Sequence, residues 1–234
     1  MKIEVGGNSV YCHTNGRVID AARKSVVFIH GSGMDHTVWT LPARHFARHG
    51  RNVVAVDLAG HGRGAGPGKQ SIEELADWIV ALLDALKIEQ AALAGHSLGS
   101  LVALDAAARH PSRVRALALV GSTAPMPVSN AILADSAANR HSAFDMLTQW
   151  GYSKRHQYGG SSNPGIWMVG ATLRLFERSK PGVLGAEDRL TPPRSSKALI
   201  NALPAPDVRI LSGSGHTLMT EAPKLLLDAL KTVL

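Results

Sequence analysis

The chain has 234 residues, of which 45% are hydrophobic, 18% charged and 5% aromatic, with a single cysteine. This composition fits one globular domain, or one domain with a small lid, that needs no disulfide or structural metal for stability. It excludes collagen, a coiled coil and wholesale disorder. No apolar run is long enough to cross a bilayer, and the first residues do not form the apolar core of a secretion signal. We therefore expect a cytoplasmic protein with no membrane partner.

The formal net charge of +7 raises the question of an anionic partner such as nucleic acid. The basic residues are scattered, however, and the longest local cluster is Lys154–His156. Because no basic stripe interleaved with aromatic residues is present, we expect no nucleic-acid partner. Cys12 has no second cysteine and no ligand spacing around it, which predicts an ordinary buried strand residue.

Strands and helices alternate along the first half of the chain. The apolar runs 26–30, 53–56 and 91–94 predict strands that are buried on both faces, with helices following at 39–49, 72–86 and 98–110. Ser71 and Glu74 form a capping box at the start of the second helix. Further strands are predicted at 2–5, 10–14, 114–120 and 208–211, and further helices at 195–202 and 222–234. This alternation predicts an α/β fold with a doubly wound, mostly parallel sheet.

The alternation lapses between about residues 123 and 182, where apolar residues recur at helical spacing. We interpret residues 1–122 and 183–234 as the α/β core and residues 123–182 as a small, largely helical cap. Only Val183 and Leu184 precede Gly185, which is too short a run for a core strand. The sequence thus indicates that a segment is missing between Leu184 and Gly185, either by real deletion or by omission.

A G-x-S-x-G motif, Gly95-His96-Ser97-Leu98-Gly99, lies between a predicted strand and a predicted helix. That setting is the one that a nucleophile elbow requires, since the turn lifts the serine hydroxyl above the sheet. The two glycines are needed because strand and helix backbones approach too closely there for a Cβ. Ser97 is therefore the candidate nucleophile.

With this elbow the chain resembles the α/β-hydrolase superfamily, in which the acid and the histidine follow the nucleophile in that order. The resemblance implies the fold predicted above and maps the catalytic histidine onto His216, in the glycine-rich loop after the last predicted strand. It maps the acid onto Asp188, with Glu187 as the second choice. We interpret Asp57, which ends an earlier strand, as structural.

Two backbone N–H groups must stabilise the oxyanion in such an enzyme. The elbow supplies one, from Leu98, and the resemblance maps the other onto Ser32 in the His30-Gly31-Ser32-Gly33 loop, with Gly33 as the alternative donor. Candidate residues for the acyl pocket are Trp39, Met126, Trp150, Trp167 and Met168, although such side chains at helical spacing are more often plain packing.

Two motifs for nucleotide binding fail. Residues 60–65 match a loose dinucleotide-binding pattern, but a glycine and proline run follows where a helix should begin. Gln70 stands where a P-loop needs serine or threonine. With no two-histidine zinc motif either, we expect no organic or metal cofactor.

The sequence thus predicts a serine hydrolase that cleaves a carboxylic ester or thioester of a small acyl substrate through an acyl-enzyme. Similar enzymes include esterases of pimeloyl-type methyl esters. The alternatives are a cofactor-free perhydrolase or a carbon–carbon bond hydrolase with the same triad. A ligand-binding protein that keeps the fold without turnover is a third alternative, and the oligomeric state is not predicted.

Overall fold

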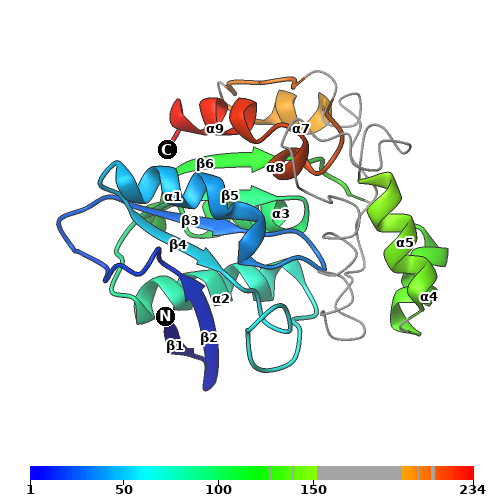
Figure 1. Ribbon diagram of the computed structural model, residues 1–234, viewed down its shortest axis with the longest axis horizontal. Coiled ribbons are helices and arrows are strands. Elements are labelled where there is room, and N and C mark those ends of the chain that lie inside the picture. Colours follow the sequence, from blue (N-terminus) through cyan, green and yellow to red (C-terminus); the bar gives the residue numbers. More distant parts are fainter. Residues whose placement is uncertain (127, 139, 152–196, 205, 212–213) are drawn as a thin grey trace.

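The computed structural model describes residues 1–126, 128–138, 140–151, 197–204, 206–211 and 214–234 (Figure 1). The described strands form one six-stranded sheet in the order β1-β2-β4-β3-β5-β6. Their bounds are β1 Lys2–Val5, β2 Asn8–His13, β3 Ser25–Ile29, β4 Asn52–Val56, β5 Ala91–His96 and β6 Val114–Val120. Strands β4, β3, β5 and β6 pair in parallel, whereas β1 pairs with β2, and β2 with β4, in the antiparallel direction. The predicted α/β class with a mostly parallel sheet is confirmed.

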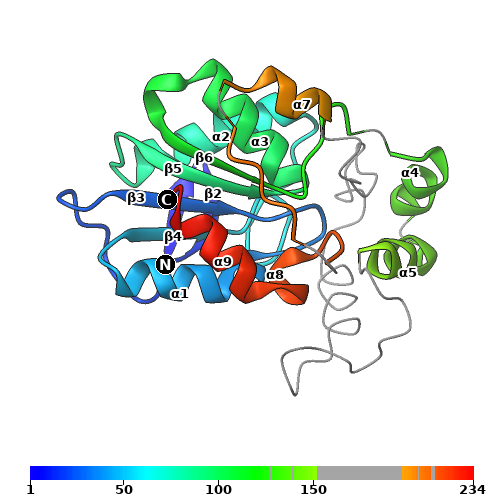
Figure 2. The same ribbon diagram turned by 90° about the horizontal axis from the view of Figure 1, so that it is seen from above.

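Helices cover both faces of this sheet. On one face lie α1 (Thr40–Arg48) and α9 (Pro223–Lys231), and on the other α2 (Ile72–Ala85) and α3 (Leu98–Arg109), which Figure 2 shows from above. Alternate residues of β3 pack into the two layers: Val27 and Ile29 against α2 and α3, Val26 and Phe28 against α1 and α9. Because both faces are covered, β3 and β4 are buried along their whole length, which explains their continuous apolar runs.

Local signals set the ends of several helices. Ser71 caps α2, where its hydroxyl accepts the backbone N–H of Glu74, and the Glu74 carboxylate accepts the N–H of Gln70. A short 3₁₀ turn, η1 (His36–Trp39), leads into α1, and another, η2 (Pro111–Arg113), separates α3 from β6. The remaining C-terminal helices are α7 (Lys197–Ala202) and α8 (Leu218–Glu221).

Two helices of the predicted cap are described, α4 (Asn130–Ala137) and α5 (His141–Trp150). They lie beyond the carboxyl ends of β3, β5 and β6, outside the layered core (Figure 1). Most of the predicted cap lies outside the described residues, as does the junction between Leu184 and Gly185. The cap boundaries therefore stay a prediction.

The predicted strand over 208–211 is wrong. The structure assigns no strand there, and the side chains of Val208 and Ile210 are 46% and 71% exposed. Within the described part of the chain β6 pairs on one side only, so residues 208–211 do not form hydrogen bonds with its open edge as a further strand would. None of the described helices combines the length and the apolar character that a membrane span requires.

Candidate active site

The turn between β5 and α3 holds Ser97 in a strained backbone conformation. Its φ of 52° and ψ of −121° are values that a residue with a side chain rarely adopts. The Ser97 N–H donates to the carbonyl of Val120 at 2.9 Å, and its own carbonyl accepts the N–H of Ser100 at 2.8 Å. These bonds tie the turn to the end of β6 and to the first turn of α3. Such outliers cost roughly 1–3 kcal/mol and often occur at functional sites.

The two glycines of the motif are required by backbone contacts, as the sequence predicted. A Cβ on Gly95 would lie 2.0 Å from the carbonyl oxygen of Gly99, and a Cβ on Gly99 would lie 2.4 Å from that of Ile29. Both obstacles are backbone atoms, which cannot move aside as a side chain can. The glycines therefore let α3 cross directly over the ends of β3 and β5, which sets the position of Ser97.

The loop after β3 lies against the serine. A Cβ on Gly31 would stand 3.1 Å from the Cβ of Ser97 and 2.9 Å from Nδ1 of His96. Ser32 is buried, and Leu98 begins α3, where the first N–H groups have no acceptor within the helix. The structure thus brings both predicted oxyanion donors to segments that adjoin Ser97.

His216 lies at the same edge of the sheet. A Cβ on Gly121 would be 3.1 Å from its Nδ1, and Gly121 directly follows Val120, whose carbonyl binds the Ser97 N–H. The rings of His216 and His96 are 4.7 Å apart between centroids. Ser97 and His216, which are far apart in the sequence, therefore lie beside two consecutive residues, the last residue of β6 and the glycine that follows it. Burial lowers the pKa of His216 to about 4, so its imidazole is neutral at pH 7.

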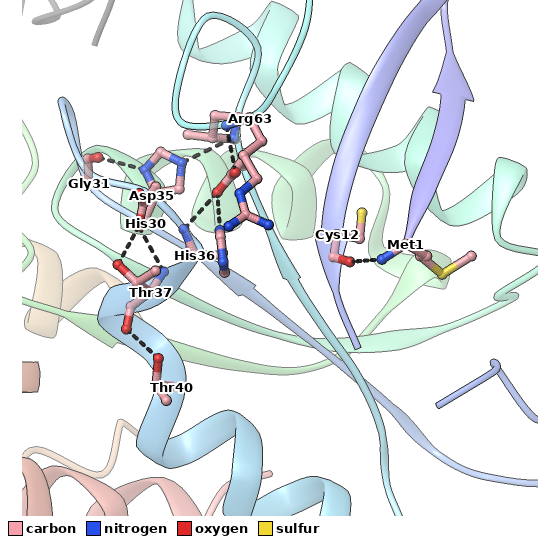
Figure 3. Close-up of polar contacts among 11 residues, drawn as sticks. Met1, Cys12, His30, Gly31, Asp35, His36, Thr37, Thr40 and Arg63 are labelled. Carbon is pink, nitrogen blue, oxygen red and sulfur yellow. Dashed lines mark hydrogen bonds and ion pairs between the residues drawn. The ribbon is translucent and has the colours of Figure 1, made fainter. Parts of the chain in front are cut away.

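His30 binds both the predicted oxyanion loop and the loop after β4. Its Nδ1 donates to the carbonyl of Gly31 at 2.8 Å, and its Nε2 accepts the N–H of Leu58 at 3.0 Å (Figure 3). This pair of bonds requires the neutral tautomer with the proton on Nδ1. Burial also lowers the pKa of His30, which keeps the ring in this state. The imidazole therefore connects the loop after β3 to the loop after β4.

Asp57 makes a second connection between these loops. Its Oδ1 accepts the N–H and the ring Nδ1 of His36, both at 2.7 Å, and its Oδ2 accepts the N–H of Arg63 at 2.8 Å (Figure 3). Burial raises the pKa of Asp57, but these hydrogen bonds outweigh it and lower the pKa below its usual value. The contacts agree with the structural role that the sequence suggested for Asp57.

Asp35, His36 and Asp57 are the group of described residues whose ligand atoms lie close enough together to hold a metal ion, within 4.8 Å of one another. The hydrogen bonds of His36 and Asp57 account for their proximity. Asp35 accepts the N–H and the hydroxyl of Thr37, as the cap of η1. These contacts are typical of a loop held together by its own polar groups.

The other predicted site residues divide into two sets. Trp39 and Met126 are buried, at 0% and 1% exposed, and Trp39 packs against Phe28 in the core, 5.2 Å between ring centroids. The pocket roles of Trp39 and Met126 therefore stay a prediction. Residues of the second set lie outside the described part of the chain: Asp188, Glu187, Trp167, Met168 and the side chain of Trp150.

Sequence reasoning gave no role to three polar residues of this site. His96 was only a position within the elbow, His30 only the start of a loop, and Glu221 was not considered. His96 and His30 have partners that are distant in the chain: His96 donates from Nε2 to the carbonyl of His216 at 2.9 Å, and His30 accepts the N–H of Leu58 at 3.0 Å. Glu221 accepts the N–H of Gly215, six residues earlier, at 2.5 Å. The sequence offered one signal for such residues: a polar side chain within an apolar stretch is expected to form hydrogen bonds.

Known proteins share this fold and parts of this sequence. The dihydrolipoyllysine-residue acetyltransferase component of the acetoin cleaving system of Pseudomonas putida is 38% identical over 122 residues, 52% of this chain and 32% of that protein. The 2-hydroxymuconate semialdehyde hydrolase of Pseudomonas sp. (strain CF600) is 29% identical over 82% of this chain and 80% of its own length. The chain spans about a third of the length of the first two curated relatives that it matches.

Among solved structures, an esterase from Exiguobacterium antarcticum superposes with a TM-score of 0.82 over 99% of this chain and 98% of its own. Its sequence identity of 16% means that this likeness shows the fold alone. The family model of the alpha/beta hydrolase fold matches residues 24–156, which include the G-x-S-x-G motif and the predicted oxyanion loop. These similarities support a hydrolase. The chain belongs to the alpha/beta hydrolase fold family.

Proposed function

We propose that the protein is a serine hydrolase that cleaves a carboxylic ester or thioester through an acyl-enzyme. The observation that carries the proposal is the strained turn at Ser97, with Gly31 and Val120 packed around it. The family relationship supports the same reading. In this proposal Ser97 is the nucleophile, His216 the general base, Asp188 the acid that orients the imidazole, and the N–H groups of Leu98 and Ser32 form the oxyanion hole.

In the first half of the reaction the Ser97 hydroxyl attacks the substrate carbonyl while His216 takes its proton. The carbonyl oxygen becomes an oxyanion that the two N–H groups stabilise, where the loss of one such donor typically removes about 3–4 kcal/mol of stabilisation. The intermediate then collapses, and the imidazolium returns the proton to the departing alcohol or thiol. Ser97 is left as an acyl ester.

In the second half a water molecule attacks the acyl ester, with His216 again taking the proton. Collapse of the second intermediate releases the carboxylic acid and restores the Ser97 hydroxyl. The base must be unprotonated for both attacks. The pKa of His216, lowered by burial to about 4, leaves the imidazole neutral at physiological pH.

The test is a panel of p-nitrophenyl esters and acyl thioesters of increasing chain length, assayed with the wild type and Ser97→Ala. The substitution should remove nearly all turnover of the best substrate, whereas Ser112→Ala, on an exposed 3₁₀ turn, should leave it unchanged. Asp188→Asn should lower kcat by about 10⁴ if Asp188 orients the imidazole. Full activity of Ser97→Ala would refute the assignment of Ser97 as the nucleophile.

Carbon–carbon bond hydrolysis is the second candidate, since a relative named as 2-hydroxymuconate semialdehyde hydrolase aligns over most of both chains. Adding 2-hydroxymuconate semialdehyde to the panel separates the two. Turnover of that compound at a kcat/KM far above that of every ester would favour the second candidate. The reverse order would favour the ester or thioester hydrolase.

A further inference from the structure

Each of three consecutive residues in the loop that carries His216 forms a hydrogen bond with another element. Gly215 donates its N–H to the carboxylate of Glu221 at 2.5 Å, and the carbonyl of His216 accepts from Nε2 of His96 at 2.9 Å. Thr217 donates both its N–H, at 3.0 Å, and its hydroxyl, at 2.9 Å, to the carbonyl of Gly151. Three consecutive residues are thus bound by α8, by the end of β5 and by the end of the cap helix α5.

Among these contacts, that of His96 alone joins the histidine loop to the nucleophile turn. His96 is the last residue of β5 and precedes Ser97 directly, so its backbone is placed by the sheet. Its ring is fully buried and lies 4.7 Å from that of His216 between centroids. On another side it packs against Gly31, where even a methyl group would stand 2.9 Å from its Nδ1. One imidazole therefore contacts the predicted oxyanion loop, the predicted base and the nucleophile turn.

The proton on His96 is assigned by its partner. A carbonyl oxygen can only accept, so Nε2 of His96 must carry hydrogen to bond the carbonyl of His216. This part-buried bond restrains the peptide of His216, and with it the Cα–Cβ direction that orients the ring. Displacement of a catalytic group by about 1 Å can lower turnover by about 10²-fold.

We propose that His96 is a positioning residue for His216, holding the base in register with Ser97 through the hydrogen bond from Nε2 to the His216 carbonyl. This inference rests on the proposed function. Position 96 is the first variable position of the G-x-S-x-G motif. The proposed role differs from simple packing because it requires a hydrogen-bond donor at one atom, Nε2.

Gln and Met at position 96 form a matched pair that separates the donor from the volume. The amide nitrogen of Gln reaches close to the place of Nε2 and can donate, while Met has similar size and flexibility but no donor. His96→Met should lower kcat for the best p-nitrophenyl ester by about 10- to 100-fold with KM changed by less than about threefold. His96→Gln should stay within about threefold of the wild type in both constants.

Two further readouts separate positioning from a general loss of stability. Hydrogen exchange of the peptide spanning residues 214–221, measured below the unfolding midpoint, should be faster in His96→Met than in His96→Gln. In His96→Met, the pH at which kcat/KM falls by half on the acid side should also rise. A loosened loop exposes the His216 ring and lets its pKa rise from about 4 towards 6.5. In the described part of the chain, the ring of His96 packs against this ring, and the carboxylate of Glu221 accepts the N–H of the preceding residue, Gly215.

The outcomes are distinguishable. Equal exchange in the two variants, or equal kcat, would overturn the positioning role of His96. A wild-type enzyme without Ser97-dependent turnover would overturn the proposed function instead, and the exchange difference would then still show whether His96 holds the loop. Faster exchange and lower kcat in His96→Met, both restored by His96→Gln, would support the inference.

Discussion

Acid should destabilise this protein well above the pH at which its carboxylates protonate, because two histidines accept protons at a much lower pH in the folded state than in the unfolded chain. Burial, and then the neighbouring His30, lower the pKa of His61 to about 3, and burial lowers that of His216 to about 4. In the unfolded chain both titrate near 6.5, so below that pH the unfolded state binds protons that the folded state does not. The free energy of unfolding therefore falls as the pH drops below 6.5. For each histidine the fall continues until the pH reaches its pKa in the folded state.

Between pH 7.5 and 5.0 each of these histidines should contribute about 2 kcal/mol to the loss of unfolding free energy, or about 4 kcal/mol together. Urea unfolding at a series of pH values measures this. His61→Asn keeps a donor for the Ala59 carbonyl, which accepts from Nδ1 of His61 at 3.1 Å, but it does not titrate. This variant should reduce the loss by about 2 kcal/mol.

His49→Asn, which removes an exposed imidazole, is the matched control. A pH dependence in His61→Asn that equals the wild-type dependence would refute the reasoning. The same reduction in His49→Asn would show that loss of any histidine, rather than burial, sets the slope.

Three further predictions concern single contacts. Gly121→Ala places a Cβ 3.1 Å from Nδ1 of His216, at a position whose φ is 56°. It should lower the kcat for the best ester by at least about tenfold and the free energy of unfolding by about 1–2 kcal/mol. Wild-type kinetics would contradict this. Thr217→Val removes the hydroxyl donor to Gly151 and should lower the free energy of unfolding by about 1 kcal/mol, with Thr217→Ser as the control; equal urea midpoints would count against that contact. Burial raises the pKa of Cys12 to about 12, so the native thiol should not react with a disulfide reagent at pH 8 until urea unfolds the chain, and prompt labelling would disprove its burial.

The parts of the fold that local sequence determines were predictable. The Ser71 hydroxyl caps α2 at the N–H of Glu74, since a capping box needs only residues that are three apart. Gly95 and Gly99 sit where a strand and a helix cross, because the elbow requires it wherever a strand, a turn and a helix follow one another. The buried parallel strands were visible as apolar runs for the same reason.

The parts that depend on distant partners were not predictable. The apolar residues Val208 and Ile210 read as a strand, but a strand exists only where a neighbour supplies hydrogen bonds. Trp39 packs beside Phe28 in the core, a contact that the residues around Trp39 do not indicate. His96 and His216 are 120 residues apart, and no spacing rule relates them. Such contacts follow from topology rather than from local pattern.

The central claim, that Ser97 is a nucleophile activated by His216, is tested most directly with a fluorophosphonate probe. Intact mass and peptide mapping after labelling at pH 7.5 should show one adduct, on Ser97, in the wild type. His216→Gln should be labelled at least about 10²-fold more slowly, because the hydroxyl then has no base. A wild-type protein that remains unlabelled, or an adduct on another residue, would contradict the account.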